Sequence, residues 1–204
     1  DGSVARSQGV FTWADITLVD EQFVVALPKD APIDVTAIIG CAVMTGSGAV
    51  YHTAAVREGE SVAVFGVGGV GLSAIAAAAV IGANPIIAVD LSEEKLRFAE
   101  KFGATIGINA SECDPVERIR ELTPMPEGTT SFGATAAGVD YAFDCIGIKQ
   151  TMEQILPAVR PGMLGHTTGG MAVLVGVPQT NVEIDARDLL VNEKKYIGSI
   201  GGSR

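Results

Sequence analysis

Short apolar runs alternate with segments of helical spacing through most of this chain. The runs are mostly β-branched or apolar, as expected for strands that are buried on both faces of a parallel sheet. They are Ser61–Phe65, Ile86–Val89, Thr105–Ile108, Val139–Phe143 and Ala172–Val175. The segments between them have helical spacing and good helix formers, and are Val70–Ile81, Glu93–Phe102, Pro115–Leu122 and Lys149–Val159. This repeated order predicts an α/β fold, a doubly wound parallel sheet with helices on both faces.

The amino-terminal part of the chain has a different pattern. Residues 11–30 alternate apolar and polar positions in short stretches that close with Pro28, which predicts two short antiparallel strands. Residues 35–55 are small and apolar with potential helical stretches, and we expect a domain boundary near Cys41. Two segments rich in glycine and hydroxyl side chains are expected to form surface loops, namely Pro124–Gly138 and Pro161–Gly170.

Composition excludes several classes of partner. The 204 residues are 48% hydrophobic, which is ample for a buried core, and their formal net charge is −10. Nucleic acids and anionic membranes need clustered Lys and Arg, so neither is an expected partner. No residue between Val62 and Val89 is charged, but glycines and Pro85 divide this stretch. We therefore expect a buried strand, helix and strand there, and not a membrane span.

The cysteines and the first residues bear on where the protein resides. Cys41, Cys113 and Cys145 are odd in number and widely spaced, which argues against a secreted disulfide framework and favours a reducing cytoplasm. The opening residues carry no apolar export signal. Because the first residue is Asp and not Met, we expect the chain to start within a longer protein.

A glycine-rich motif carries the strongest chemical signal. The sequence Gly66-Val67-Gly68-Gly69-Val70-Gly71 directly follows a predicted strand and opens a predicted helix, the context in which GxGxxG indicates dinucleotide binding. Gly66 would permit the tight turn, Gly68 the close approach of the pyrophosphate, and Gly71 the packing of helix on strand. The phosphates would then meet free N–H groups at the start of the helix, where Gly69 and Val70 lie. The alternative is a tight turn without a ligand.

Asp90 ends the next predicted strand, where a carboxylate can accept hydrogen bonds from both hydroxyls of the adenosine ribose. A 2′-phosphate there would place like charges side by side, so the sequence favours NAD over NADP. Lys95, about one helical turn further on, is a candidate to lie over the same ribose. Helix capping by Asp90 and an ordinary surface position for Lys95 are the alternatives.

Longer segments resemble one protein family. The segments Gly40-Cys41-Ala42-Val43-Met44-Thr45-Gly46-Ser47-Gly48-Ala49 and 61–73 are similar to the zinc-dependent, medium-chain alcohol dehydrogenases. The resemblance continues through 87–90, 138–144 and 173–178, and so covers nearly the whole chain. It implies a Rossmann-type cofactor domain at 43–199, preceded by a short β remnant of a GroES-like catalytic domain at 1–42. Residues 200–204 would begin the return to that catalytic domain.

The resemblance also implies site residues. Cys41 matches a ligand of the catalytic zinc, and thiolate ligation suits that metal. Thr45 would lie near the nicotinamide, Val70 would follow the phosphate turn, and four further residues would line the path from ribose to nicotinamide. These four are Cys145, Ile146, Val175 and Val177. For Cys41 the alternative is a buried small hydrophobic residue.

The zinc site that the resemblance implies is incomplete in this chain. The family also needs a Cys and a His or carboxylate from its amino-terminal lobe, of which only the last strands are expected here. Cys113 lies on a predicted surface turn and is a poor substitute, while His52 and His166 do not have ligand spacing. The isolated chain is therefore expected to be inactive.

In the whole enzyme, zinc would act as a Lewis acid on a bound alcohol, and hydride would pass to the nicotinamide. The resemblance implies a small alcohol or aldehyde as substrate, and a homodimer or homotetramer joined through a last strand at Lys195–Ile200. A zinc-free reductase of the same superfamily and a non-catalytic NAD-binding module are the alternatives. An upstream Cys and His would favour the dehydrogenase.

Overall fold

The computed structural model describes residues 16–125, 136–163 and 167–202. The chain divides into two units, Asp1–Ala37 and Ile38–Arg204. The described part of the first unit contains the short helices η1 (Glu21–Phe23) and α1 (Ile33–Thr36). The second unit contains the parallel sheet and the remaining helices.

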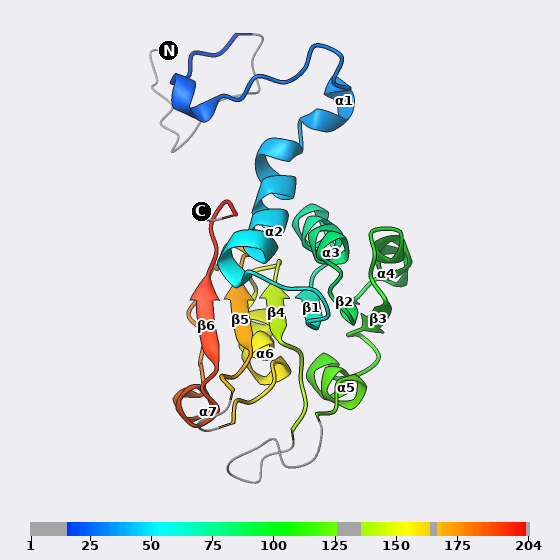
Figure 1. The fold of residues 1–204 in the computed structure, drawn as a ribbon, viewed down its shortest axis with the longest axis vertical. Helices are drawn as coiled ribbons and strands as arrows, with labels where there is room; N and C mark the ends of the chain where they lie inside the picture. Colours follow the sequence, from blue (N-terminus) through cyan, green and yellow to red (C-terminus); the bar gives the residue numbers. More distant parts are fainter. Residues whose placement is uncertain (1–15, 126–135, 164–166, 203–204) are drawn as a thin grey trace. The chain divides into compact units, whose positions relative to one another are not determined.

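Six parallel strands form the sheet, in the order β3-β2-β1-β4-β5-β6 (Figure 1). The strands are β1 (Val62–Phe65), β2 (Ile86–Asp90), β3 (Ile106–Asn109), β4 (Tyr141–Asp144), β5 (Met171–Leu174) and β6 (Lys195–Gly198). Val62 pairs with both Ile86 and Tyr141, which places β1 between β2 and β4. The chain order reverses between β1 and β4, and this is the point where sheets of this kind bind ligands. The predicted doubly wound parallel sheet is confirmed.

Helices cover the sheet on both faces. A helix follows each of the strands β1 to β5. In that order the helices are α3 (Gly69–Ile81), α4 (Glu93–Glu100), α5 (Pro115–Leu122), α6 (Lys149–Ala158) and α7 (Ala186–Val191). Val62 and Val64 share one buried cluster with residues of α3 and α4. Ala63 and Phe65 share the other with residues of α5, α6 and α7. Side chains that alternate along β1 thus fill both layers, as the apolar run of the sequence requires.

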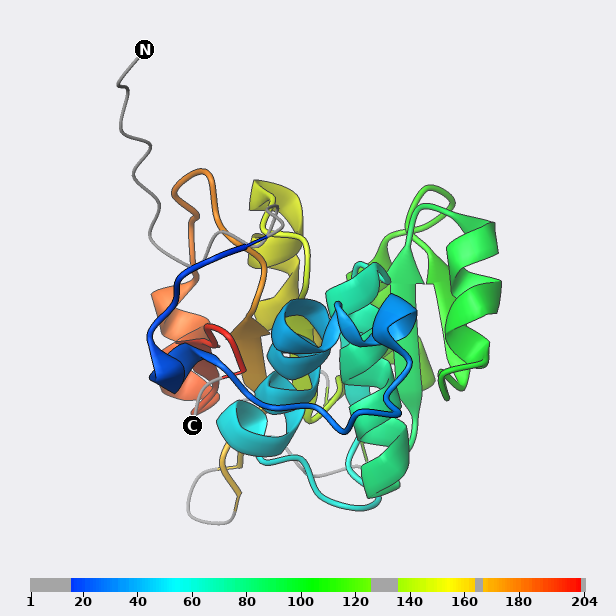
Figure 2. The ribbon, with the colours of Figure 1, turned by 90° about the horizontal axis from the view of Figure 1, so that it is seen from above.

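A helical segment leads into the sheet. It consists of η2 (Ile39–Val43), α2 (Met44–Gly48) and η3 (Ala49–Ala54), of which η2 and η3 are π-helical. Figure 2 shows this segment beside α3, in agreement with the close contact between α2 and α3. A side chain at Gly46 would meet the Val70 carbonyl oxygen, so this glycine allows the two helices to approach closely. The helical stretches predicted for residues 35–55 are present.

Several predictions for single elements were wrong. The two antiparallel strands predicted for residues 11–30, and with them the β remnant, are not found in the described part, residues 16–30. Alternation makes a segment suited to a strand, but two strands alone are marginal, and Ile16 and Leu18 are 91% and 99% exposed. The helix α7 was missed, although Asp185 caps it by accepting from Arg187 N and Asp188 N.

The strand boundaries differ from the prediction by one residue at an end in most strands, and by two residues in β4 and β6. β4 begins at Tyr141 and not at Val139, because Val139 bridges to Val159 outside the sheet ladder. The last strand covers Lys195–Gly198 and not Lys195–Ile200. The loop predicted at Pro124–Gly138 includes an antiparallel bridge between Pro124 and Ala137, and residues 126–135 lie outside the described part.

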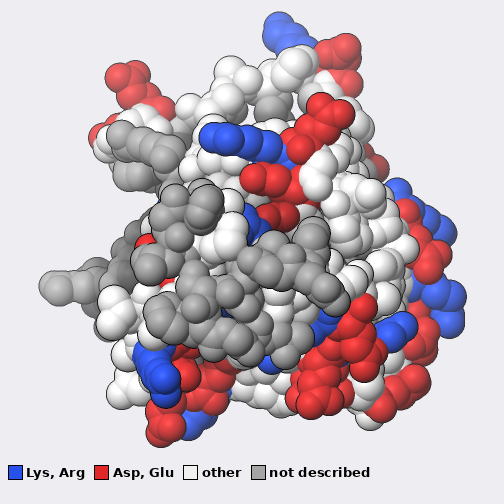
Figure 3. Space-filling model, turned by 60° about the horizontal axis from the view of Figure 1, so that its bottom comes forward, with Lys and Arg blue, Asp and Glu red and all other residues white. Residues whose placement is uncertain are grey.

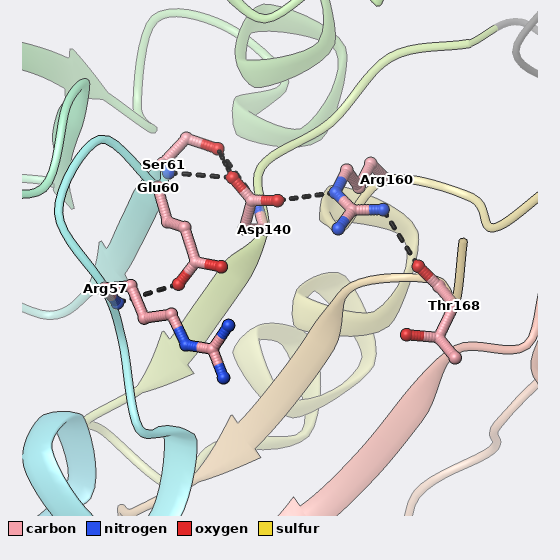
Figure 4. A network of polar contacts seen from close by, with 6 residues as sticks. All are labelled: Arg57, Glu60, Ser61, Asp140, Arg160 and Thr168. Atoms are coloured by element: carbon pink, nitrogen blue, oxygen red, sulfur yellow. Dashed lines mark hydrogen bonds and ion pairs between the residues drawn. The ribbon is translucent and has the colours of Figure 1, made fainter. Parts of the chain in front are cut away.

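A polar network joins strands at the amino-terminal end of the sheet (Figure 4). Ser61 donates to Asp140 Oδ2 from both its backbone N, at 2.8 Å, and its hydroxyl, at 2.7 Å. Arg160 Nε donates to the other oxygen, Asp140 Oδ1, and Arg160 Nη1 donates to the Thr168 carbonyl. Burial alone would raise the pKa of Asp140, but the hydrogen bonds from Ser61 and Arg160 outweigh it and lower that pKa.

We expect Asp140→Asn to lower the free energy of unfolding by about 2 kcal/mol at pH 7. The amide would turn a donor toward either Ser61 or Arg160, where the carboxylate now accepts. Because the folded-state pKa of Asp140 is depressed, its contribution is complete above the unfolded pKa of about 4 and is lost as the pH falls through the folded value. Urea unfolding of both proteins at pH 7 and pH 3 measures this, and an equal difference at the two pH values would contradict it.

The surface shows no uniformly basic area in the view of Figure 3. Lys and Arg side chains there are interspersed with Asp and Glu side chains. Ion pairs on the surface of the described part include Arg118 with Glu121 and Lys149 with Glu153. Across the described residues, no helix has both the length and the apolar character that crossing a membrane requires.

Candidate functional site

The turn between β1 and α3 contains the glycine motif. β1 ends at Phe65, and the Gly66 N–H donates to the Val89 carbonyl at 2.8 Å, which ties the turn to β2. Gly68 is the N-cap of α3, and its carbonyl accepts from Leu72 N at 2.8 Å. The N–H groups of the first helical turn, at Gly69, Val70 and Gly71, have no carbonyl before them in the helix. Their partial positive charge suits an anion.

The three glycines of the motif differ in the space that is available for a side chain. Gly66 has φ +88°, and a side chain there would meet Ile146 Cγ1. A side chain at Gly71 would overlap the Gly66 carbonyl oxygen, which would separate helix from strand. A Cβ at Gly68 would have nothing within 4 Å of it. The first and third glycines therefore satisfy the fold, and the second leaves open space beside the helix start.

Asp90 ends β2 with its carboxylate directed at the glycine turn. Oδ2 accepts from Val67 N at 3.0 Å, and Oδ1 accepts from Leu91 N at 2.9 Å and Ser92 N at 3.1 Å. The side chain is 10% exposed, and Lys95 Nζ lies 3.7 Å from Oδ2. Lys95 is 56% exposed, so its pairing with Asp90 contributes little to stability. Ser92 caps α4, with its hydroxyl accepting from Lys95 N.

A second turn, formed by residues 145–147 after β4, faces the glycine turn. The buried Asp144 carboxylate accepts from Ile146 N at 3.0 Å and from Gly147 N at 3.1 Å. Burial, assisted by the charge of Asp144, raises the pKa of the Cys145 thiol. Cys145 is therefore a protonated, mainly apolar wall near neutral pH.

The two turns enclose a pocket of about 480 Å³ at the carboxyl end of the sheet. Six residues singled out in the sequence line it, namely Gly66, Gly68, Asp90, Lys95, Cys145 and Ile146. The others that line it are Phe65, Val89, Leu91, Ala110, Ile148, Gln150, Thr151 and Gln154. Its size falls within the range of pockets for small molecules and cofactors.

The sequence reasoning missed the part of the pocket contributed by α6. Gln150, Thr151 and Gln154 lie in this helix, and Ile148 is its N-cap. A signal was present, because a helix that follows the strand at the switch point must begin at the same edge as the glycine turn.

Comparison with known proteins assigns the family. The family profile described as "Zinc-binding dehydrogenase" matches residues 69–204. The chain belongs to the zinc-binding dehydrogenase family. It is 36% identical over 197 residues to an S-(hydroxymethyl)glutathione dehydrogenase of Saccharomyces cerevisiae, a match that covers 95% of this chain and 47% of that protein. The chain thus spans about half the length of the curated relatives it matches.

Solved structures of this family share the fold. Benzyl alcohol dehydrogenase from Acinetobacter calcoaceticus superimposes with a TM-score of 0.74 at 36% identity, covering 88% of this chain and 45% of that one. A zinc-binding dehydrogenase from Sinorhizobium meliloti, bound to NADP, gives 0.64 at 28% identity and covers 79% and 43%. The resemblance read from the sequence is confirmed.

The remaining site residues predicted from the sequence do not line the pocket. Val177 adjoins the second turn, because a side chain at Gly147 would meet the Val177 backbone, and Val177 is itself 81% exposed. Thr45 lies in α2, whose Gly46 packs against Val70. Gly69 and Gly71 are close in sequence to pocket residues but are not part of the wall. Val175 N donates to the carbonyl of Asp144, the residue before Cys145, and Val175 is not part of the wall either.

The described residues of this zinc-binding dehydrogenase chain do not form a complete zinc site. Cys41 is exposed in η2 and offers one thiol. Among the described residues, no three His, Cys, Asp or Glu side chains are grouped so as to hold a metal ion. His52 lies in η3, Cys113 is exposed before α5, and His166 is outside the described part. By contrast, the open space at Gly68 and the Asp90 carboxylate fit a dinucleotide.

Proposed function

We propose that this chain is the NAD-binding part of a zinc-dependent alcohol dehydrogenase. One observation carries the proposal: the Asp90 carboxylate and the open face of Gly68 line the same pocket at the switch point of the sheet. A turn that served the fold alone would need Gly66 and Gly71 but would have no steric need for Gly68. This favours a ligand over an unoccupied turn.

Different residues of the chain would hold different parts of the cofactor. The N–H groups of Gly69, Val70 and Gly71 would donate to the pyrophosphate, and Gly68 would let it approach. The Asp90 carboxylate would accept from the ribose hydroxyls, beside Lys95. The family resemblance further assigns the nicotinamide side to Thr45, Cys145, Ile146, Val175 and Val177. When bound, the nicotinamide ring supplies the hydride chemistry.

The choice of NAD over NADP rests on Asp90. Its carboxylate is 10% exposed and already faces the pocket, so a 2′-phosphate would meet a poorly screened like charge. Lys95 is a single, mostly exposed cation and offsets little of that repulsion. A similar dehydrogenase from Sinorhizobium meliloti was solved with NADP bound, so the preference proposed here rests on Asp90 and not on the fold.

Substrate, metal and assembly follow from the whole enzymes that the chain resembles. We propose a small alcohol or aldehyde as substrate, in line with the names of the relatives. Cys41 would contribute one zinc ligand, with the other ligands supplied from beyond the described residues. β6 is an outer strand of the sheet and would pair with a second copy in a dimer or in each half of a tetramer. The cofactor domain at 43–199, the catalytic part at 1–42, the return at 200–204 and a cytoplasmic location belong to the same proposal.

The test is a titration of the 204-residue chain with NADH and NADPH, followed by the fluorescence of the reduced nicotinamide. We expect NADH to bind more tightly, and Asp90→Gly to lower the preference for NADH by about tenfold or more, because a repulsion of a few kcal/mol is removed. Binding of neither cofactor by the folded chain would overturn the proposed function.

A matched variant controls for the loss of backbone contacts. Asp114 caps α5 by accepting from Val116 N and Glu117 N, and it lies outside the pocket. Asp114→Gly should therefore leave the ratio of the two dissociation constants unchanged. An equal change of that ratio in both variants would show that Asp90 has no part in selecting the cofactor.

A further inference from the structure

Asp144 is a buried carboxylate that accepts hydrogen bonds from backbone N–H groups. It ends β4 with no exposed surface, and it forms no ion pair with any cation of the described residues. Oδ1 accepts from Ile146 N at 3.0 Å and Oδ2 from Gly147 N at 3.1 Å, while the Asp144 carbonyl accepts from Val175 N and Gly176 N. Burying a carboxylate without a cation is costly unless such donors satisfy it. Asp144 therefore holds the backbone of the turn at 145–147 through its side chain.

The turn at 145–147 lies against the glycine turn. A Cβ at Gly66 would meet Ile146 Cγ1, so the Ile146 side chain occupies the space that Gly66 leaves free. Behind the turn, a side chain at Gly147 would meet the Val177 backbone, and one at Gly176 would meet Gly147 N. The turn is thus set between the loop after β5 and the first glycine of the motif.

We propose that Asp144 is a positioning residue for dinucleotide binding, which acts through the backbone of Ile146 and Gly147 on the wall of the pocket. The inference rests on the proposed function, because it explains how the site is held ready before the cofactor arrives. Asp144 does not line the pocket itself, whereas Cys145 and Ile146 do. A preformed wall spares the cofactor the cost of ordering the turn.

The first test compares two isosteric variants at opposite ends of β4. Asp144→Asn would place an amide N–H2 against a backbone N–H, and Asp140→Asn would do the same at the end away from the pocket. We expect both to lower the midpoint of thermal unfolding, but only Asp144→Asn to raise the dissociation constant of NADH, by about tenfold. Titrations are made at a temperature where all three proteins are folded by circular dichroism.

Two results would overturn the inference in that comparison. One is an unchanged NADH affinity in a folded Asp144→Asn protein, and the other is an equal loss of affinity in both variants, which would indicate a general effect of destabilisation. If the unmodified chain does not bind NADH, the proposed function fails first, and the two failures are thereby distinguished.

The second test needs no variant and so does not depend on Asp144→Asn folding. Hydrogen exchange of the Ile146 and Gly147 amides is measured in the unmodified chain with and without NADH. We expect both amides to be protected before NADH is added and to change little afterwards, since their acceptor is Asp144. Amides that exchange freely until NADH is added would show that the cofactor orders the turn, and would overturn the inference.

Discussion

Replacing Gly68 by Asp is expected to abolish measurable NADH binding by this chain while leaving its fold intact. A Cβ at this position meets nothing within 4 Å, and the backbone lies at φ −80°, which any L-residue adopts. Gly68 is also the N-cap of α3, a position where Asp is among the preferred residues. The new carboxylate would lie where the proposed pyrophosphate rests. Two like charges about 4 Å apart repel by about 4 kcal/mol at an effective dielectric constant of about 20, or nearly a thousandfold in affinity.

Gly68→Asn separates charge from bulk. Its side chain has nearly the same shape as that of Asp and also caps helices well, but it is neutral. We expect Gly68→Asn to bind NADH more weakly than the unmodified chain and far more tightly than Gly68→Asp, with similar unfolding midpoints for the two variants. Fluorescence titration and thermal unfolding measure both quantities. Equal NADH affinity in Gly68→Asp and Gly68→Asn would contradict a phosphate at this helix start.

Replacing Gly71 by Ala is expected to lower the free energy of unfolding by about 3 kcal/mol, at the upper end of the cost of overpacking. The added Cβ would overlap the Gly66 carbonyl oxygen and lie 3.3 Å from Val64 Cγ1. A backbone oxygen within a tied turn cannot rotate away as a side chain could, so α3 must move off β1. The Gly66 N–H that bonds Val89 would be displaced with it.

The matched substitution for this prediction is Gly68→Ala, three positions earlier in the same motif. It adds the same methyl group to open space, and its unfolding free energy should change by less than about 1 kcal/mol. Urea unfolding of both variants gives the comparison. A Gly71→Ala protein as stable as Gly68→Ala would refute the steric role assigned to the third glycine.

The sequence predicted the second unit well because the burial there is periodic. All five proposed strand segments contain a strand, and most of the apolar side chains in these strands are buried in one of the two clusters that flank the sheet. The helices that follow them begin where the sequence offers a cap or a proline, as at Ser92 and at Asp114 with Pro115. Local and long-range preferences agree in this part of the chain.

Prediction failed where a pattern is compatible with more than one structure. Residues 16–30 alternate as a strand would, but a strand also needs a partner for its backbone hydrogen bonds, and alternation does not provide one. The short helix α7 was missed because its six residues carry too little apolar periodicity to distinguish it from a loop.

The candidate site was predicted only where local structure fixes its residues. Gly66, Gly68 and Asp90 could be placed because a strand, a turn and a helix fix them locally. Ile146 and Cys145 were reached only through the family resemblance. The α6 residues that line the pocket, and Asp144 behind its wall, were not predicted. Their positions depend on how β4 lies beside β1, a contact between segments far apart in the sequence.

The three backbone hydrogen bonds that Asp90 accepts bear on any attempt to redesign this protein for a phosphorylated ribose. Replacing Asp90 by a residue without a side-chain oxygen would also remove the acceptor that aligns Val67, Leu91 and Ser92. A successful redesign must therefore supply a neutral oxygen at the end of β2 before it adds a cation for the phosphate. Because Asp90 serves both the proposed choice of cofactor and the backbone structure beside the pocket, a substitution at this position alters both.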